Sequence, residues 1–84
     1  MVRKQLNELT ETVTNTVAYI NEKLKFNKKQ LKHLNKLIND YSDKEKVKAE
    51  QDELINIITI LEQYLYKYKK ILYRLNVIRD LLEK

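Results

Sequence analysis

The sequence predicts an all-α protein, a long antiparallel helical hairpin that dimerises into a four-helix bundle. Three observations lead to this prediction. The 84 residues include no Gly and no Pro, the two residue types that most often form turns and end helices. Apolar residues recur at steps of three and four in both halves of the chain, as they do on the buried side of a helix. One short polar stretch separates the halves, so we expect residues 1–84 to form a single helical-hairpin domain.

The first half carries one apolar stripe and predicts a helix over about residues 2–41. Its members have the spacing of packed helices and are Val2, Leu6, Leu9, Val13, Val17, Ile20, Leu24, Asn27, Leu31, Leu34, Ile38 and Tyr41. Within residues 9–17 two steps of four follow one another, a stutter that locally relaxes a left-handed supercoil. The same region contains four β-branched residues that lower helix propensity, Thr10, Thr12, Thr14 and Thr16. The sequence therefore leaves open whether residues 10–16 are helical.

The break between the halves lies at residues 40–45, which read Asp-Tyr-Ser-Asp-Lys-Glu. Ser42 and Glu45 form a Ser-x-x-Glu capping box, which is typical of a helix start. We therefore expect a turn at about residues 42–43 and a second helix over about residues 44–83. The alternative is one unbroken helix in an extended coiled coil. We prefer the hairpin because the stripe loses its register and becomes polar only at this point.

The second helix carries a longer stripe and a further apolar row beside it. The stripe consists of Val47, Gln51, Leu54, Ile58, Leu61, Leu65, Tyr68, Leu72, Leu75, Arg79 and Leu82. The further row has members seven residues apart and consists of Ile57, Tyr64, Ile71 and Ile78. Together they make an apolar face too wide for one partner helix to cover. We expect this row to form the interface of a homodimer, or a groove for another protein that could replace the second subunit.

The charges predict how the two helices align. Two arms of similar length, each roughly 60 Å, would place residue i opposite about residue 86 − i. Residues 23–36 contain six lysines and no acid, and they would oppose residues 50–63, which contain four acids and no base. Exposed ion pairs are each worth only about 0–1 kcal/mol, so they would select the register more than they stabilise the hairpin.

The sequence contains no set of residues that would support catalysis, a metal or a cofactor. There is no Cys, and the one histidine, His33, has no second histidine to complete a ligand set. Paired carboxylates occur, but none belongs to the Glu-x-x-His motif of di-iron bundles. No apolar run approaches the roughly 20 residues of a membrane-spanning helix, and no leader segment is visible. We therefore expect a cytoplasmic (intracellular), non-enzymatic protein with no membrane span.

Basic residues interleaved with tyrosines indicate a second candidate surface. Single-stranded nucleic acid is bound by cations that meet its phosphates and by aromatic rings on which its bases stack. The formal net charge is +5. The residues that could make such contacts are Lys25, Lys28, Lys29, Lys32, Lys36, Tyr66, Lys67, Lys69, Lys70, Tyr73 and Arg74.

Three functions are compatible with this sequence. The favoured one is a non-enzymatic interaction module, an adaptor or small regulator that binds a protein partner through helical-bundle faces. A dimeric nucleic-acid-binding bundle is the first alternative, and an immunity or toxin-neutralising protein is the second. The abundance of Lys, Asn, Ile and Tyr is also typical of A+T-rich genomes, such as those of low-GC bacteria, their phages and plasmids, or archaeal viruses.

Overall fold

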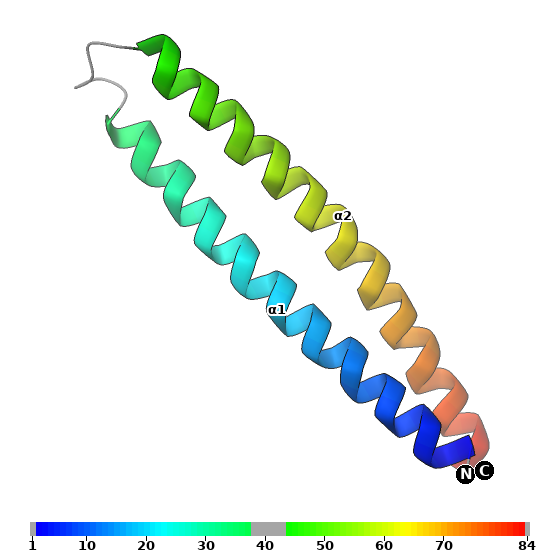
Figure 1. The fold of residues 1–84 in the computed structure, drawn as a ribbon. Helices are drawn as coiled ribbons and strands as arrows, with labels where there is room; N and C mark the ends of the chain where they lie inside the picture. Colours follow the sequence, from blue (N-terminus) through cyan, green and yellow to red (C-terminus); the bar gives the residue numbers. More distant parts are fainter. Residues whose placement is uncertain (1, 38–43, 84) are drawn as a thin grey trace.

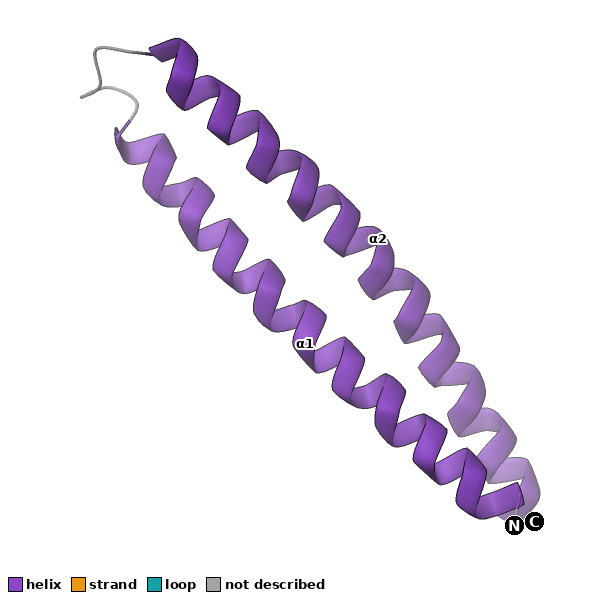
Figure 2. Cartoon of the chain, viewed as in Figure 1, coloured by secondary structure: helices purple, strands orange, loops and turns teal. Residues whose placement is uncertain are grey.

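The computed structural model describes residues 2–37 and 44–83, and it confirms the predicted helical hairpin. Helix α1 spans Val2–Leu37 and helix α2 spans Lys44–Glu83. The two helices run antiparallel side by side, with both chain ends at the same end of the molecule (Figure 1). Both described segments are helical along their whole length (Figure 2). The expected end of the first helix near residue 41, the turn at 42–43 and the capping residue Ser42 lie outside the described residues.

The threonine-rich stretch of α1 is helical, which answers the question that the sequence left open. Each of its four threonine hydroxyls donates a hydrogen bond to the backbone carbonyl four residues earlier. The oxygen–oxygen distances are 2.8–3.0 Å for Thr10, Thr12, Thr14 and Thr16. These bonds satisfy the hydroxyls within their own helix, so the stretch stays helical despite its low intrinsic propensity.

Contacts between the helices confirm the predicted register. We call the end of the hairpin where α1 ends and α2 begins its closed end. Near this end, the Gln51 side-chain amide donates a hydrogen bond to the side-chain oxygen of Asn35. At the open end, the Arg3 guanidinium donates to the Leu82 carbonyl oxygen at 3.5 Å. Both pairs follow the expected alignment of residue i with about residue 86 − i. Between them a core of Ile20, Leu24 and Ile58 packs against Leu31, Leu61, Leu65 and Tyr68.

Asn27 and Arg79 are polar members of the two stripes that face each other, and each makes its hydrogen bond within its own helix. The Asn27 side-chain amide donates to the Lys23 carbonyl oxygen at 2.7 Å. The Arg79 guanidinium donates to the Asn76 side-chain oxygen at 3.3 Å. Within residues 2–37 and 44–83, no buried side-chain nitrogen or oxygen lacks a hydrogen-bond partner. Asn27 and Arg79 are therefore satisfied without pairing across the seam, whereas the seam residue Gln51 donates its hydrogen bond across it to Asn35.

The core is thin because the molecule is elongated. Its dimensions are 64 × 15 × 14 Å, and its radius of gyration is 18.8 Å, against about 12 Å for a compact protein of this length. The chain exposes 7044 Å², whereas a compact protein of its mass would expose about 5,300 Å². Among the described residues no side chain is completely buried. A single hairpin therefore exposes about 1,700 Å² more than a compact fold of the same size.

Candidate interaction surface

The four residues predicted for a partner interface remain accessible in the hairpin. Ile57 is exposed, Tyr64 and Ile78 have 50% and 46% of their surface exposed, and Ile71 is half-buried. The α2 seam is the stripe from Val47 to Leu82 that packs against α1. All four residues lie one position before a residue of this seam, so they share one flank of α2. Helix α1 covers the seam and leaves this flank open to another contact.

The apolar row is longer than the four residues predicted from the sequence. Ile60 and Leu81 are also exposed, and each lies one residue before a seam residue, on the same flank of α2. With the basic residues at the intervening positions, the row becomes a second complete stripe with steps of three and four. We call it the outer stripe: Ile57, Ile60, Tyr64, Lys67, Ile71, Arg74, Ile78 and Leu81. The sequence already contained this pattern, because the outer stripe has the same spacing as the α2 seam and lies one residue before it at every position.

Helix α1 contributes to the same face of the hairpin. Phe26 of α1 and Ile57 of α2 line one groove of about 490 Å³ between the helices, together with Leu34 and Leu54. Phe26 is exposed and lies one residue before the seam residue Asn27, as expected for the flank that adjoins the outer stripe in an antiparallel pair. The acids Glu50 and Glu53 also line this groove. They continue the spacing of the outer stripe toward the closed end, where its chemistry changes from apolar to acidic.

The opposite flank of the hairpin is mainly polar and carries both lysines and acids. Its residues lie one position after a seam residue, and the Gln51–Asn35 hydrogen bond is on this side. Six of the candidate nucleic-acid contacts fall here, and we call them the basic flank: Lys25, Lys28, Lys32, Tyr66, Lys69 and Tyr73. Lys29, Lys36 and Lys70 point outward from the backs of the helices. All nine of these side chains are exposed.

Two of the candidate nucleic-acid contacts lie elsewhere. Lys67 and Arg74 belong to the outer stripe, and Lys67 shares a shallow depression with Ile60 and Tyr64. The structure therefore separates these two cations from Tyr66 and Tyr73, although the four residues are interleaved in the sequence. A helix turns by about 100° per residue, so neighbouring residues in the sequence face different partners.

The basic residues of the two helices also differ in their surroundings. The register places the lysines of residues 25–36 beside the acid-containing part of α2. In contrast, residues 66–74 of α2 lie beside residues 12–20 of α1, which contain no charged residue. The positive charge of Lys69 and Lys70 is therefore not balanced by acids on the facing helix segment.

The tyrosines on these surfaces are highly exposed, and two of them hold a lysine over the ring. Tyr66 and Tyr73 have 65% and 71% of their surface exposed. The Lys70 ammonium lies 5.0 Å from the centre of the Tyr66 ring, and the Lys23 ammonium lies 5.4 Å from that of Tyr19. These are cation–π distances, and they bring positive charge directly beside an aromatic surface.

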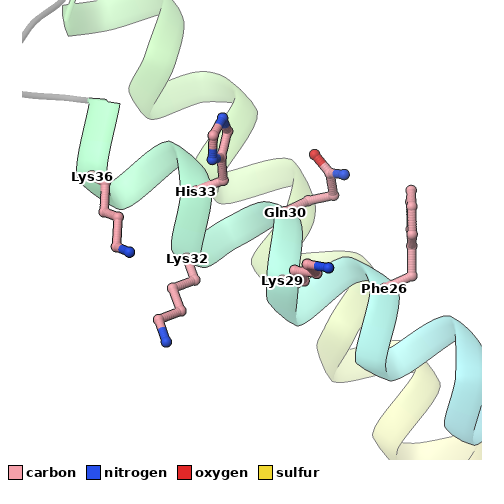
Figure 3. A pocket seen from close by; sticks show the side chains of 6 residues that line it. All are labelled: Phe26, Lys29, Gln30, Lys32, His33 and Lys36. Atoms are coloured by element: carbon pink, nitrogen blue, oxygen red, sulfur yellow. The ribbon is translucent and has the colours of Figure 1, made fainter.

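His33 lies in an open depression on α1 rather than in a closed pocket. Figure 3 shows this depression, with Phe26, Gln30 and His33 on one side of the helix and Lys32 and Lys36 on the other. His33 is exposed, and none of the residues that line the depression is acidic. Within the two described helices, no three His, Cys, Asp or Glu side chains gather in a way that could hold a metal ion.

Neither described helix has a segment both long and apolar enough to cross a membrane. No family model, curated protein or solved structure matches the chain.

Proposed function

We propose that this protein is a non-enzymatic interaction module, an adaptor or small regulator that binds a protein partner through its helical-bundle faces. In its own assembled state it is a homodimer that forms a four-helix bundle. A protein partner would bind the same face of the hairpin and could take the place of the second subunit.

The exposed outer stripe is the observation that carries this proposal. Single exposed apolar residues are normal on a protein surface, but a contiguous apolar patch marks an interaction site. Here six apolar side chains follow one flank of α2 over residues 57–81, and Phe26 of α1 extends the same face. Covering such a patch removes apolar surface from water, which is the main driving force of helix association.

The amount of exposed surface is sufficient for a stable interface. A standard protein–protein interface buries about 800 Å² on each partner. The hairpin exposes about twice that area in excess of a compact fold of its mass. A chain this small rarely gains more than about 3–5 kcal/mol from one core, so association would also supply stability that the hairpin lacks.

Sedimentation equilibrium tests the self-association. Over a range of about 1–100 µM, we expect a helical species with twice the chain mass of 10.2 kDa. A helical monomer over the whole range would contradict the homodimer.

Photo-crosslinking in cells tests whether the outer stripe is the face that binds another polypeptide. A photoreactive residue at position 71 should link the chain to a second polypeptide. The same residue at Asn56, on the outward back of α2, should not. Equal crosslinking at both positions would contradict a specific role for the outer stripe.

A second candidate function is the binding of single-stranded nucleic acid by the basic flank. The observation in its favour is the uncompensated charge of Lys69 and Lys70 beside the exposed rings of Tyr66 and Tyr73. Phosphates would meet the ammonium groups and bases would stack on the rings. Fluorescence anisotropy with mixed-sequence oligonucleotides at about 50 and 200 mM salt tests this function, because binding through phosphates weakens steeply with salt. An absence of binding at the lower concentration would eliminate it.

A further inference from the structure

We propose that the outer stripe is the seam of a homodimer in which the two α2 helices pack against each other in antiparallel orientation, with the closed ends of the two hairpins at opposite ends. The two-fold axis would pass close to residue 69, so that residue i of one α2 faces about residue 138 − i of the other. This inference rests on the proposed function, because it specifies the geometry of the self-association proposed there.

The position of the outer stripe around α2 suits a corner of a four-helix bundle. Each member of the stripe precedes a seam residue by one position, which corresponds to about 100° around the helix axis. In a square bundle, the two neighbours of a helix lie about 90° apart as seen from its axis. Helix α1 fills one of these positions, and the outer stripe faces the other.

The two ends of the outer stripe have the same apolar character. Ile57 and Ile60 lie at one end, and Ile78 and Leu81 lie at the other. All four side chains are exposed in the hairpin. In the antiparallel arrangement Ile57 faces Leu81 of the second copy, and Ile60 faces Ile78. A two-fold interface must be self-complementary in this way, whereas a surface for an unrelated partner has no such requirement.

The two cations of the stripe decide between parallel and antiparallel packing. A parallel α2 pair would place Lys67 against Lys67 and Arg74 against Arg74, which are like-charge contacts within the seam. The antiparallel pair places the Arg74 guanidinium against the Tyr64 ring of the other copy, a favourable cation–π combination. It also places Lys67 beside Ile71, where the lysine stem can pack and its ammonium can reach water.

The remaining symmetric arrangement packs α2 of one hairpin on α1 of the other, with both closed ends together. In the observed register, this would set Ile71, Ile78 and Leu81 against the first half of α1. The corresponding flank of that segment is polar and consists of Gln5, Glu8, Thr12 and Thr16. The antiparallel α2–α2 arrangement instead covers the apolar ends of the stripe with apolar residues and sets its two cations against Tyr64 and Ile71.

Distances between spin labels test this geometry directly. The chain contains no Cys, so each single-cysteine variant carries one label per chain. Asn56→Cys and Lys70→Cys form a matched pair, because both replace exposed residues on the outward back of α2. In the antiparallel dimer the two labels at position 56 are about 40 Å apart along the bundle, and the two at position 70 are only about 3 Å apart in that direction.

Pulsed electron paramagnetic resonance should therefore give a long distance for the Asn56→Cys variant and a short one for the Lys70→Cys variant. Short distances for both variants would overturn the antiparallel α2 seam while leaving the homodimer intact. An absence of intermolecular coupling in both variants, with sedimentation at the monomer mass, would overturn the homodimer itself. The two failures are therefore distinguishable.

Discussion

Phe26 of α1 and Ile57 of α2 line the same groove, although they come from different helices and are 31 positions apart in the sequence. This shared groove shows which flank of α1 adjoins the outer stripe of α2. One side of the hairpin thus carries the outer stripe, which Phe26 extends onto α1, and the opposite side carries the basic flank.

A negative charge in the middle of the outer stripe should prevent self-association. Ile71→Asp places a carboxylate where an apolar contact is proposed, and an unpaired buried charge costs several kcal/mol. We expect the dissociation constant to rise at least about 100-fold, as measured by sedimentation. Because Ile71 is half-buried within the hairpin, Ile78→Asp provides a second variant at an exposed position of the stripe.

Asn56→Asp is the matched control for these two variants, since it adds the same charge to the back of α2. It should leave the dissociation constant nearly unchanged. A native-like dimer in both stripe variants would contradict the assignment of the interface.

A cavity in the seam should destabilise the hairpin itself. Leu24 is buried and packs in the core with Ile20 and Ile58. Leu24→Ala should lower the free energy of unfolding by about 2–5 kcal/mol, measured by circular dichroism at a fixed protein concentration. Lys25→Ala, on the exposed surface next to it, should have an effect of less than about 0.5 kcal/mol. Similar effects of the two substitutions would be inconsistent with the observed core.

The hydrogen bond between Gln51 and Asn35 should contribute little to stability because it is exposed to solvent. Asn35→Ala removes this bond but also introduces a better helix former, and Asn21→Ala makes the same exchange on the same flank without removing it. The difference between the two variants should therefore isolate the bond, and we expect about 0.5–1 kcal/mol in urea unfolding. A difference above about 2 kcal/mol would show that the pair does much more than align the helices.

The threonine stretch should respond to alanine with opposite signs at neighbouring positions. Thr12 is exposed and its hydroxyl is bonded only to its own helix, so Thr12→Ala should stabilise the protein by about 0.5 kcal/mol through higher helix propensity. Thr10 is buried, so Thr10→Ala loses packing and should destabilise it by about 1 kcal/mol. Thermal unfolding of both variants measures the signs, and stabilisation in both would contradict the burial of Thr10.

If the basic flank binds nucleic acid, reversing its uncompensated charges should weaken that binding. The double change Lys69→Glu with Lys70→Glu should reduce the affinity at least about 10-fold at low salt and flatten its dependence on salt. Lys67 is left unchanged because it lies on the outer stripe, where a substitution would also disturb self-association. Lys25→Glu with Lys28→Glu is the comparison, and its effect should be smaller because these lysines lie beside the acids of α2. Equal losses from the two pairs would contradict the role of the uncompensated charge.

The sequence by itself determined the helices and their alignment. The absence of Gly and Pro, the apolar stripes with steps of three and four, and the separation of lysines from acids were sufficient to predict the hairpin and its register. The absence of Gly and Pro and the spacing of the apolar residues act locally, within each helix. The register follows because two arms of similar length place the lysine-rich stretch of one opposite the acidic stretch of the other. The excess apolar row of α2 was visible for the same reason.

The tertiary structure decided which flank of the hairpin each exposed residue belongs to. Helix α2 carries two stripes one residue apart, and periodicity alone does not show how far the second one extends or what adjoins it. Packing of Ile58 against Ile20 and Leu24 assigns one stripe to α1 and leaves the other exposed. That choice places Lys67 and Arg74 among apolar side chains and Tyr66 on the basic flank. The physical reason is that a rotation of about 100° per residue turns adjacent positions toward different neighbours, so each side chain's surroundings depend on which stripe is buried.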